Sequence, residues 1–423
     1  MTSTNKPKLH YVWVILFVSN LVVVGALGLA RFSYSLLLPP MQAGLDMDNT
    51  QAGALATADT VGYLALSLIG GALASRYSPR AVVTAGLVLT GTGMLLTGAA
   101  QGVFMAVLGR AITGVGSGAS NVPVMGLLLA WFSRNRRGAA SGIAVAGASI
   151  AIIAVSPLVP RMVEAYPDNG WRMSWYLFGG VTLGLAVLAA MLLRNRPEEM
   201  GLAPWGDAAA SVGPSRPQGA LQWGQVYQSP AVWHLGGVYI AFGFSYIIYL
   251  TFFNKRLLSE GGYSPLEAGT LFMVFGWFSL FCGLIWGAVS DAIGRKQALV
   301  LVYLVHAAAF TLFGLATTKA GFVLSAALFG LTAWSIPAIM TAFCGDVLGS
   351  RMAPAALGFI TLFFGIGSAA GPSIAGAIAD SNGSFVPVYL LAGGVALVGA
   401  VGALLLRPVS TILPATNLNP EKG

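Results

Sequence analysis

Long apolar segments alternate with short polar connections along almost the whole chain. A helix that crosses the hydrocarbon core of a bilayer needs about 20 mostly apolar residues, and the sequence contains twelve segments of this kind. They cover residues 12–39, 50–75, 81–100, 103–131, 138–160, 173–193, 231–253, 265–289, 298–317, 321–344, 355–379 and 385–406. The pattern therefore predicts an all-α membrane protein with 12 transmembrane helices.

One connection is far longer than the others. It is rich in Pro, Gly, Ala and Ser, and it separates six apolar segments from the next six. We expect an N-terminal six-helix bundle over 1–193, a cytoplasmic linker over 194–229, a C-terminal six-helix bundle over 230–407 and a cytoplasmic tail over 408–423.

Composition excludes several classes of protein. The 423 residues are 56% hydrophobic and 9% charged, whereas a soluble domain is about 25% charged. Two cysteines and three scattered histidines are too few for a disulfide framework or a metal site, so we expect no metal and no cofactor. The net charge of +8 comes from short basic clusters between apolar segments, which are typical of membrane topology signals and not of a nucleic-acid surface.

The basic residues also predict the orientation of the chain. The two ends and the connections on the same side carry 15 of the 22 Lys and Arg, while the connections on the other side carry 5. Cytoplasmic loops are enriched in Lys and Arg. We therefore expect a multi-pass protein of the cell (inner) membrane with both termini in the cytoplasm.

The two halves repeat one another. A repeat of the triplet Phe32-Ser33-Tyr34 begins at Phe244, and four Gly or Pro pairs recur at offsets of 214 to 216 residues. These pairs are Gly71 and Gly287, Gly142 and Gly358, Pro123 and Pro337, and Pro157 and Pro372. Two parallel six-helix repeats around a central site are typical of secondary transporters that work by alternating access.

A connection in the second half reads Gly287-Ala-Val-Ser-Asp291-Ala-Ile-Gly294-Arg295-Lys296. It resembles the signature loop of the major facilitator superfamily, Gly-x-x-x-Asp-Arg-x-Gly-Arg-Arg or Lys. The resemblance implies two pseudo-symmetric six-helix bundles, a monomer, and a cytoplasmic latch in which Asp291 faces the start of the eleventh helix. Gly287 would let helices approach closely. Plain anchoring by Arg295 and Lys296 at the lipid surface is the alternative.

The corresponding loop of the first half departs from this signature. It keeps Gly71, Arg76 and Arg80, but Ser75 stands where the signature has Asp and Ser78 where it has Gly. We therefore assign the gating role mainly to Asp291.

Two further segments resemble known transporter groups. The run from Gly28 to Pro39, which includes Arg31-Phe-Ser-Tyr34-Ser35, resembles the bacterial YbfB/YjiJ-like subgroup. The run from Arg196 to Pro204 is similar to a loop of oxalate/formate and monocarboxylate carriers. Those carriers use an arginine in the eighth helix, which this chain lacks, so their carboxylate site cannot be transferred.

Three charged residues lie deep inside apolar segments, where each costs at least about 2.5–3.5 kcal/mol on insertion scales. Arg31 lies eight residues before Pro39 and Asp59 nine residues after Thr50, so both are about 12–13 Å from one end of neighbouring antiparallel helices. Arg110 lies about 10 Å into the segment 103–131.

We expect Arg31 to bind an anionic group of a small organic solute and Asp59 to carry a proton, since burial favours the neutral form of a carboxyl. A permanent ion pair that only neutralises two buried charges is the alternative. The helical spacing predicts these companions in the substrate site: Tyr34, Ser35, Arg110, Ser117, Asn121, Tyr246, Tyr249 and Trp334. The polar stripe from Arg110 to Asn121 is interpreted as the wall of a wet cavity or as a tight helix seam.

The preferred function is a secondary active transporter of a carboxylate-like anion with proton coupling. Proton-coupled efflux of lipophilic or drug-like compounds is the first alternative, although the Gly-Pro motif that such exporters carry in their fifth helix is missing. A nutrient sensor on a transporter fold is the second alternative. An enzyme is not expected, because one acid and two arginines do not form a catalytic set.

Overall fold

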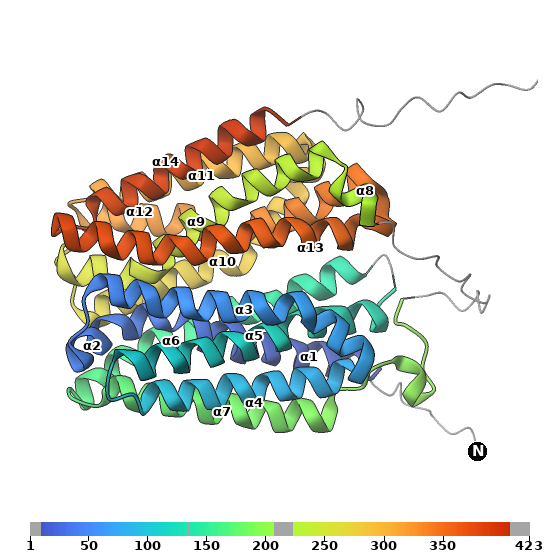
Figure 1. Ribbon diagram of the computed structural model, residues 1–423, viewed down its shortest axis with the longest axis horizontal. Helices are drawn as coiled ribbons and strands as arrows, with labels where there is room; N and C mark the ends of the chain where they lie inside the picture. Colours follow the sequence, from blue (N-terminus) through green and yellow to red (C-terminus); the bar gives the residue numbers. More distant parts are fainter. Residues whose placement is uncertain (1–9, 134–135, 207–222, 407–423) are drawn as a thin grey trace, which may run out of the picture.

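The computed structural model describes residues 10–133, 136–206 and 223–406, and these residues form two helical bundles (Figure 1). The first bundle contains α1 (Val12–Val23), η1 (Val24–Phe32), α2 (Tyr34–Leu45), α3 (Asn49–Tyr77), α4 (Pro79–Gly98), α5 (Val103–Trp131), α6 (Arg137–Ala165) and α7 (Gly170–Leu192). The second contains α9 (Pro230–Ser259), α10 (Pro265–Ile293), α11 (Arg295–Leu315), α12 (Lys319–Gly330), α13 (Ser335–Asn382) and α14 (Val386–Leu404). Between them lie the short helices η2 (Pro197–Met200) and α8 (Trp223–Tyr227).

The predicted membrane fold is confirmed. Eleven helical segments of the described chain are long and apolar enough to cross a bilayer. The 29-residue helix α3, whose middle carries Asp59, is the twelfth long segment. Helices satisfy their own backbone hydrogen bonds, so they can stand in lipid where no water is available to do so. The tail 408–423 and much of the linker lie outside the described residues.

Two membrane segments differ in detail from the prediction. The first does not end at Pro39: α2 continues through Pro39 and Pro40 to Leu45. It also contains nine residues of π-helix, η1, at the level of Arg31. The tenth predicted segment is broken into α12 and the first part of α13, which together form the span Lys319–Gly349. The rest of α13 forms the next span, Ala355–Asn382, after Gly349, where the backbone turns through a positive φ of 76°.

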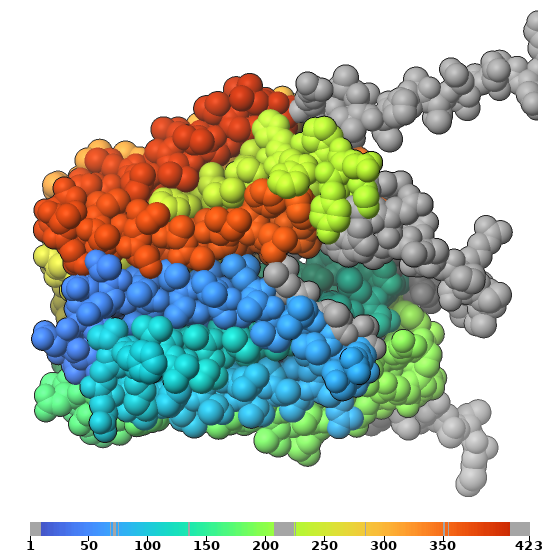
Figure 2. Space-filling model, viewed as in Figure 1, coloured from blue at the N-terminus to red at the C-terminus, as the bar shows by residue number. Residues whose placement is uncertain are grey.

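The two bundles touch along three helix pairs, α3 with α13, α6 with α10, and α2 with α9. Figure 2 shows them pressed together at one end and parted by a hollow toward the other, where α8 lies. We call the first of these the closed end, defined by Asn49 and Thr50 at the start of α3 and by Asp380 near the end of α13. Glycines permit the approach there: a Cβ added at Gly53 or Gly376 would collide with backbone of the opposite bundle.

Asp380 joins the bundles at the closed end. Its carboxylate accepts four hydrogen bonds from the first turn of α3: from the Asn49 amide (3.1 Å) and side chain (2.8 Å), and from the Thr50 amide (2.7 Å) and hydroxyl (2.6 Å). The first amides of a helix have no partner inside the helix, and the helix dipole favours an anion beside them. The second bundle thus supplies a cap to a helix of the first.

We expect Asp380→Asn to loosen the closed end by ~1 kcal/mol, because hydrogen bonds to a charged acceptor are stronger than neutral ones. The reporter is a cysteine at Thr57, whose hydroxyl bonds across the bundles to Ala369 and Ser373, in a background without Cys282 and Cys344. Its labelling by a thiol reagent should accelerate about fivefold. Asp48→Asn, at the N-cap of the same helix inside one bundle, should leave the rate unchanged. Equal rates in all three proteins would show that Asp380 does not hold the bundles together.

Candidate functional site

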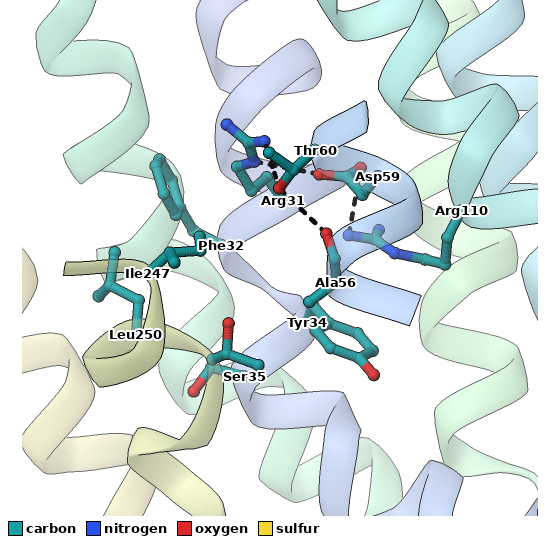
Figure 3. Close-up of a pocket in the computed structure, with 11 residues that line it drawn as sticks. Arg31, Phe32, Tyr34, Ser35, Ala56, Asp59, Thr60, Arg110, Ile247 and Leu250 are labelled. Atoms are coloured by element: carbon teal, nitrogen blue, oxygen red, sulfur yellow. Dashed lines mark hydrogen bonds and ion pairs between the residues drawn. The ribbon is translucent and has the colours of Figure 1, made fainter. Parts of the chain in front are cut away.

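The candidate site is built around Asp59, in the middle of α3. One carboxylate oxygen lies 3.0 Å from Nε of Arg31, and the other lies 3.2 Å from a terminal nitrogen of Arg110. The three side chains are at most 8% exposed. Figure 3 shows the acid between the two guanidinium groups. A buried charge is tolerated when an opposite charge and hydrogen bonds compensate it. In this trio the acid is fully compensated, but one of the two positive charges is not, so the net charge is +1.

Local backbone structure brings the arginines to the acid. Arg31 is in the last turn of the π-helical stretch η1, and π-helical turns inside α-helices are frequent at functional sites. Arg110 Nη1 donates a hydrogen bond of 2.6 Å to the carbonyl oxygen of Ala30 in the same stretch. The Arg110 guanidinium also lies over the rings of Tyr34 and Trp175, at 4.9 and 5.3 Å from their centres. Arg110 therefore holds both Asp59 and the backbone next to Arg31.

Glycines set the spacing between α3 and α5. A Cβ at Gly114 would collide with the backbone of Asp59, and one at Gly62 would collide with the carbonyl oxygen of Ala111. Small residues let membrane helices approach until their backbones touch. This contact brings the base of the Arg110 side chain within reach of Asp59.

A small pocket lies beside the trio. Its volume is about 20 Å³, which is room for about one water molecule. It is lined by Arg31, Phe32, Tyr34, Ser35, Ala56, Asp59, Thr60 and Arg110 of the first bundle and by Ile247, Leu250 and Thr251 of the second. In Figure 3 the charged groups lie on one side and Phe32, Ile247 and Leu250 on the other. The pocket thus has a cationic wall and an apolar wall, and its walls come from both bundles.

Four of the residues predicted for substrate binding line this pocket. They are Arg31, Tyr34, Ser35 and Arg110. Tyr34 is fixed by a 2.7 Å hydrogen bond from its hydroxyl to the Ala52 carbonyl oxygen. Ser35 contacts the second bundle, because its hydroxyl accepts a 3.1 Å hydrogen bond from the side chain of Asn254.

The polar stripe of α5 divides: Arg110 lines the pocket, while the part from Gly114 onward packs against α3 as a helix seam. Gly114 and Gly118 face the backbone of α3 at distances that leave no room for a Cβ. Ser117 is buried, with its hydroxyl bonded to the Thr113 carbonyl oxygen at 2.9 Å. Asn121 donates a 3.0 Å hydrogen bond to the Tyr63 hydroxyl. Neither Ser117 nor Asn121 lines the pocket.

The three predicted residues of the second half lie in different surroundings. Tyr249 is in the core of the second bundle, bonded to Ser325 at 2.8 Å and surrounded by aromatic rings. Tyr246 is buried in a stack with Phe242. Trp334 reaches the first bundle, with its indole nitrogen 3.2 Å from the Ser149 hydroxyl and its ring 5.1 Å from that of Phe32. Two of the three are thus near pocket residues of the first bundle: the ring of Trp334 contacts Phe32, and Tyr246 is close enough to Arg31 to interact with its charge.

Two partners of Arg31 were not in the predicted set. A terminal nitrogen donates a 3.0 Å hydrogen bond to the Thr60 hydroxyl, and the guanidinium lies 4.8 Å from the centre of the Tyr63 ring. Tyr63 could have been found, since it follows Asp59 by one helical turn. Thr60 could not have been found in this way, because it is adjacent to Asp59 and adjacent helix positions do not share a face. Both side chains nevertheless bond to Arg31, because its planar guanidinium group presents donors to two acceptors at once.

The signature loop forms an ion-pair cluster at the end opposite the closed end. Arg295 pairs with Asp291, lies 3.6 Å from Asp346 and donates a 2.6 Å hydrogen bond to Ser290. Lys296 donates to the Leu406 carbonyl oxygen at 2.8 Å. The Asp291 side chain is 66% exposed, and its ion-pair partner in the described chain is Arg295.

The glycine predictions for this loop differ in outcome. A Cβ at Gly287 would meet nothing within 4 Å, so the predicted close helix approach is absent there in this conformation. Gly294 joins α10 to α11 with a φ of 93°, a conformation that favours glycine. The surroundings of Gly71 lie outside the described part of the chain.

The first-half loop has the same backbone shape without the glycine. Ser78, 216 residues before Gly294, joins α3 to α4 with φ 125° and ψ 142°, close to the 93° and 150° of Gly294. Its hydroxyl accepts a 3.3 Å hydrogen bond from the Ala81 amide. Arg76 is exposed and lies 5.5 Å from the ring of Tyr77, while the Arg80 amide donates to Asn195 at 3.0 Å.

No group of three or more His, Cys, Asp or Glu that could hold a metal ion occurs among the residues that the structure describes. The charged groups that line the pocket are one acid and two guanidinium groups.

We expect Asp59→Asn to destabilise the protein strongly, by about 3–5 kcal/mol, because two buried guanidinium groups lose their counter-charge. Adding Arg110→Met should restore a large part of the loss, since it removes the more deeply buried of the two cations. The measurement is the midpoint of thermal unfolding of the single and double variants. Glu267→Gln, which removes the acid of the exposed pair with Lys319, should change little. Additive losses in the double variant would contradict the coupling of the two side chains.

We expect Ser78→Gly to stabilise the protein by about 1 kcal/mol, because a non-glycine residue in this region of φ/ψ space stores strain. Thermal unfolding should shift upward by a few degrees. Ser229→Gly is the matched control: it flanks α9 with an ordinary φ of −83° and makes no capping bond. A decrease for Ser78→Gly would mean that the hydrogen bond to Ala81 outweighs the strain.

The structure and the sequence are similar to those of membrane transporters. The nucleoside transporter NupG superimposes with a TM-score of 0.73 at 13% identity, covering 93% of this chain and 100% of that one. A bacterial homologue of the human lysosomal transporter Spinster, in an inward-facing and unoccupied conformation, gives a TM-score of 0.69 at 14% identity and covers 95% and 96% of the two chains. At these identities the likeness concerns the fold alone.

Curated relatives align over most of their length. The hexuronate transporter of Bacillus subtilis is 26% identical over 90% of this chain and 92% of its own. The probable sulfoacetate transporter SauU of Cupriavidus necator is 24% identical over 90% and 91%. Monocarboxylate transporter 13 of Rattus norvegicus is 25% identical over 81% and 76%.

A family model described as "Uncharacterised MFS-type transporter YbfB" matches residues 23–404, nearly the whole chain. The sequence resemblance is therefore confirmed, for the superfamily and for the subgroup. The chain belongs to the YbfB family of major facilitator superfamily transporters, and it is a membrane transporter, not an enzyme.

Proposed function

We propose that the protein is a secondary active transporter that moves a small organic anion together with a proton by alternating access. The observation that carries the proposal is the position of Asp59 between Arg31 and Arg110, beside a pocket that both bundles line. The relatives named for hexuronate, sulfoacetate and monocarboxylates support it, because all three substrates carry an acidic group that is ionised near neutral pH.

In this proposal the carboxylate of Asp59 occupies the place that the substrate's acidic group takes during transport. With Asp59 ionised, the two arginines and the acid have a net charge of +1. A proton on Asp59 removes the negative charge that both guanidinium groups face, and a monoanion can then supply the counter-charge in its place. The loaded site again has a net charge of +1, so loading it with proton and anion adds no net charge to the membrane interior.

The two arginines have different tasks in this scheme. Arg31 bonds to Asp59 and Thr60 through two of its three nitrogens, which leaves the third to meet an anion in the pocket. Arg110 is 1% exposed and is bonded to Ala30 and Asp59. We assign anion binding to Arg31 and proton carriage to Asp59. Arg110 lines the pocket, adds charge and positions the other two.

The conformation supports alternating access with the closed end outside. The basic residues predict that both chain ends and the linker are cytoplasmic. The described helices next to them, at the start of α1, in α8 and at the end of α14, lie toward the end opposite the closed end (Figure 1). The outer ends of the bundles would then be together, and the cluster of Arg295, Asp291 and Asp346 would form part of a cytoplasmic latch when the inner ends meet. We take the transporter to act as a monomer in the inner membrane.

The decisive test is uptake into proteoliposomes. A pH gradient should drive accumulation of the transported anion by the unmodified protein, with labelled glucuronate, sulfoacetate and lactate as the candidates. Asp59→Asn, assayed well below its lowered unfolding midpoint, should abolish this accumulation and keep counterflow exchange, because exchange needs the anion site but no net proton movement. Glu267→Gln, an exposed acid away from the pocket, should behave like the unmodified protein. Unchanged pH-driven accumulation by Asp59→Asn would remove the proton role.

Arg31→Lys should lower the apparent affinity for the anion at least about tenfold, because an ammonium group cannot reproduce the planar fork that bonds to Asp59, Thr60 and a ligand together. The concentration dependence of exchange measures it. Arg161→Lys makes the same replacement at an exposed position at the end of α6 and should change nothing. An affinity that survives Arg31→Lys would exclude Arg31 as the anion ligand.

A further inference from the structure

Four hydroxyl side chains line the pocket beside the charged trio, and they differ in their hydrogen bonds. The hydroxyls of Tyr34 and Thr60 donate to backbone carbonyl oxygens of α3, at 2.7 and 3.0 Å. The hydroxyl of Thr251, from α9, makes no hydrogen bond within the part of the chain that the structure describes. Thr251 therefore has a polar group at the pocket that the protein itself does not use.

The Thr251 hydroxyl is also turned away from its own helix. A threonine inside a helix commonly donates to the carbonyl oxygen one turn earlier, as Thr90 and Thr270 do. Thr251 makes no such bond to Ile247, although the residue is only 5% exposed. Its oxygen is not sealed inside the protein, in contrast to the unpaired oxygen of Thr182. The hydroxyl can therefore be reached from the pocket that it lines.

Ser35 brings another hydroxyl to the same pocket from the first bundle. Its oxygen accepts the 3.1 Å hydrogen bond from Asn254, and its hydrogen has no acceptor among the described residues. In Figure 3, Ser35 and Leu250, the residue before Thr251, lie on the side of the pocket away from the charged groups. Each bundle thus supplies one hydroxyl whose hydrogen is free to bond to a ligand.

The cationic wall of the pocket offers a free donor as well. Nε and one terminal nitrogen of Arg31 bond to Asp59 and Thr60, while the other terminal nitrogen has no partner in the described chain. The space between the walls is about 20 Å³, roughly one water molecule. A ligand that bonds to both Arg31 and Thr251 therefore needs two oxygens that lie close together. A carboxylate oxygen and an oxygen on the adjacent carbon form such a pair.

We propose that Thr251 determines the substrate specificity of the transporter. Together with Ser35, it recognises a hydroxyl or carbonyl oxygen on the carbon next to the substrate's carboxylate, which rests on the anion site that the proposed function assigns to Arg31. A hydroxyl group can donate and accept, so Thr251 bonds to a 2-hydroxy acid and to a 2-oxo acid alike. The space is smaller than these acids, and filling it separates walls that belong to different bundles. Short acids are therefore favoured.

Recognition by Thr251 also makes binding depend on both bundles. Of the three residues that the second bundle contributes to the pocket, Thr251 is the polar one. The first bundle holds the carboxylate, and the second bundle holds the neighbouring oxygen. A ligand shifts a conformational equilibrium toward the state that it binds better. An acid with this oxygen therefore favours the conformation in which the bundles meet around it, whereas an acid without it lacks this bond.

The binding test compares L-lactate with isobutyrate, in which a methyl group replaces the hydroxyl. Affinities for the purified full-length protein are measured by the shift of thermal unfolding with ligand concentration at neutral pH, where both acids are ionised. The unmodified protein should bind lactate at least about tenfold more tightly, because two hydroxyls can bond to it. Equal affinities, or binding of neither acid, would overturn the proposal.

Thr251→Val removes the hydroxyl and keeps the shape of the side chain. The lactate preference should fall about fivefold, which corresponds to one hydrogen bond, while Thr251→Ser should keep most of it. Thr270→Val makes the same replacement at an exposed position of α10 and should leave the preference unchanged. The unfolding midpoint of Thr251→Val without ligand should not decrease, because no bond within the protein is lost. A lower midpoint with an unchanged preference would show a structural role and overturn the proposal.

Competition during exchange in proteoliposomes provides the transport arm. Unlabelled lactate should compete with labelled lactate better than isobutyrate does, and Thr251→Val should remove most of this difference. Equal competition by the two acids in the unmodified protein would contradict a role of Thr251 in specificity. Loss of pH-driven accumulation with the lactate preference intact would instead concern the proton coupling of the proposed function, and the assignment of Thr251 would stand.

Discussion

The structure depends on the compensation of one buried acid by two buried bases. Asp59 is enclosed in the first bundle, where an isolated ion would be very unfavourable, and Arg31 and Arg110 approach it from two other helical segments. Removing Asp59 would leave two uncompensated cations in the membrane interior, whereas removing one arginine would leave a neutral ion pair. The arrangement also retains an excess positive charge next to a pocket, which is a physical reason for an anion to enter it.

The helices around the trio are shaped to permit this arrangement. The π-helical stretch η1 brings Arg31 and the Ala30 carbonyl to the same level. The glycines Gly62 and Gly114 allow α3 and α5 to touch, so that Arg110 reaches the acid from a buried position. Helices α3 and α5 thus carry Asp59 and Arg110 as well as a contact in which their backbones touch.

The two halves are alike in fold and unlike in chemistry. The backbone of Ser78 repeats that of Gly294 across the pseudo-symmetry, which shows how closely the repeats follow each other. The first bundle nevertheless supplies all the charges at the pocket, while the second supplies Ile247, Leu250 and Thr251. Bonds that join the halves include those of Asp380 with the start of α3, of Asn254 with Ser35 and of Trp334 with Ser149. This division is what a transporter needs if one bundle binds the anion and the other closes over it.

Much of this architecture followed from the sequence alone. The twelve segments, the two halves and the superfamily could be predicted because a bilayer imposes apolar length on each helix separately, and because the signature motif is local. The pairing of Arg31 with Asp59 was also foreseeable, since two antiparallel helices joined by a short loop bring together residues that lie at similar depth in the membrane.

Other features were decided by tertiary structure. Arg110 was expected in the substrate site, and its contact with Asp59 depends on how closely α3 and α5 approach. Tyr249 lies at helical spacing from Tyr246, yet its ring enters the aromatic core of its own bundle. The cap that Asp380 provides for α3 joins residues about 330 positions apart. Periodicity tells which residues share a face of one helix, but the partner of that face is determined by the packing of helices that are distant in sequence.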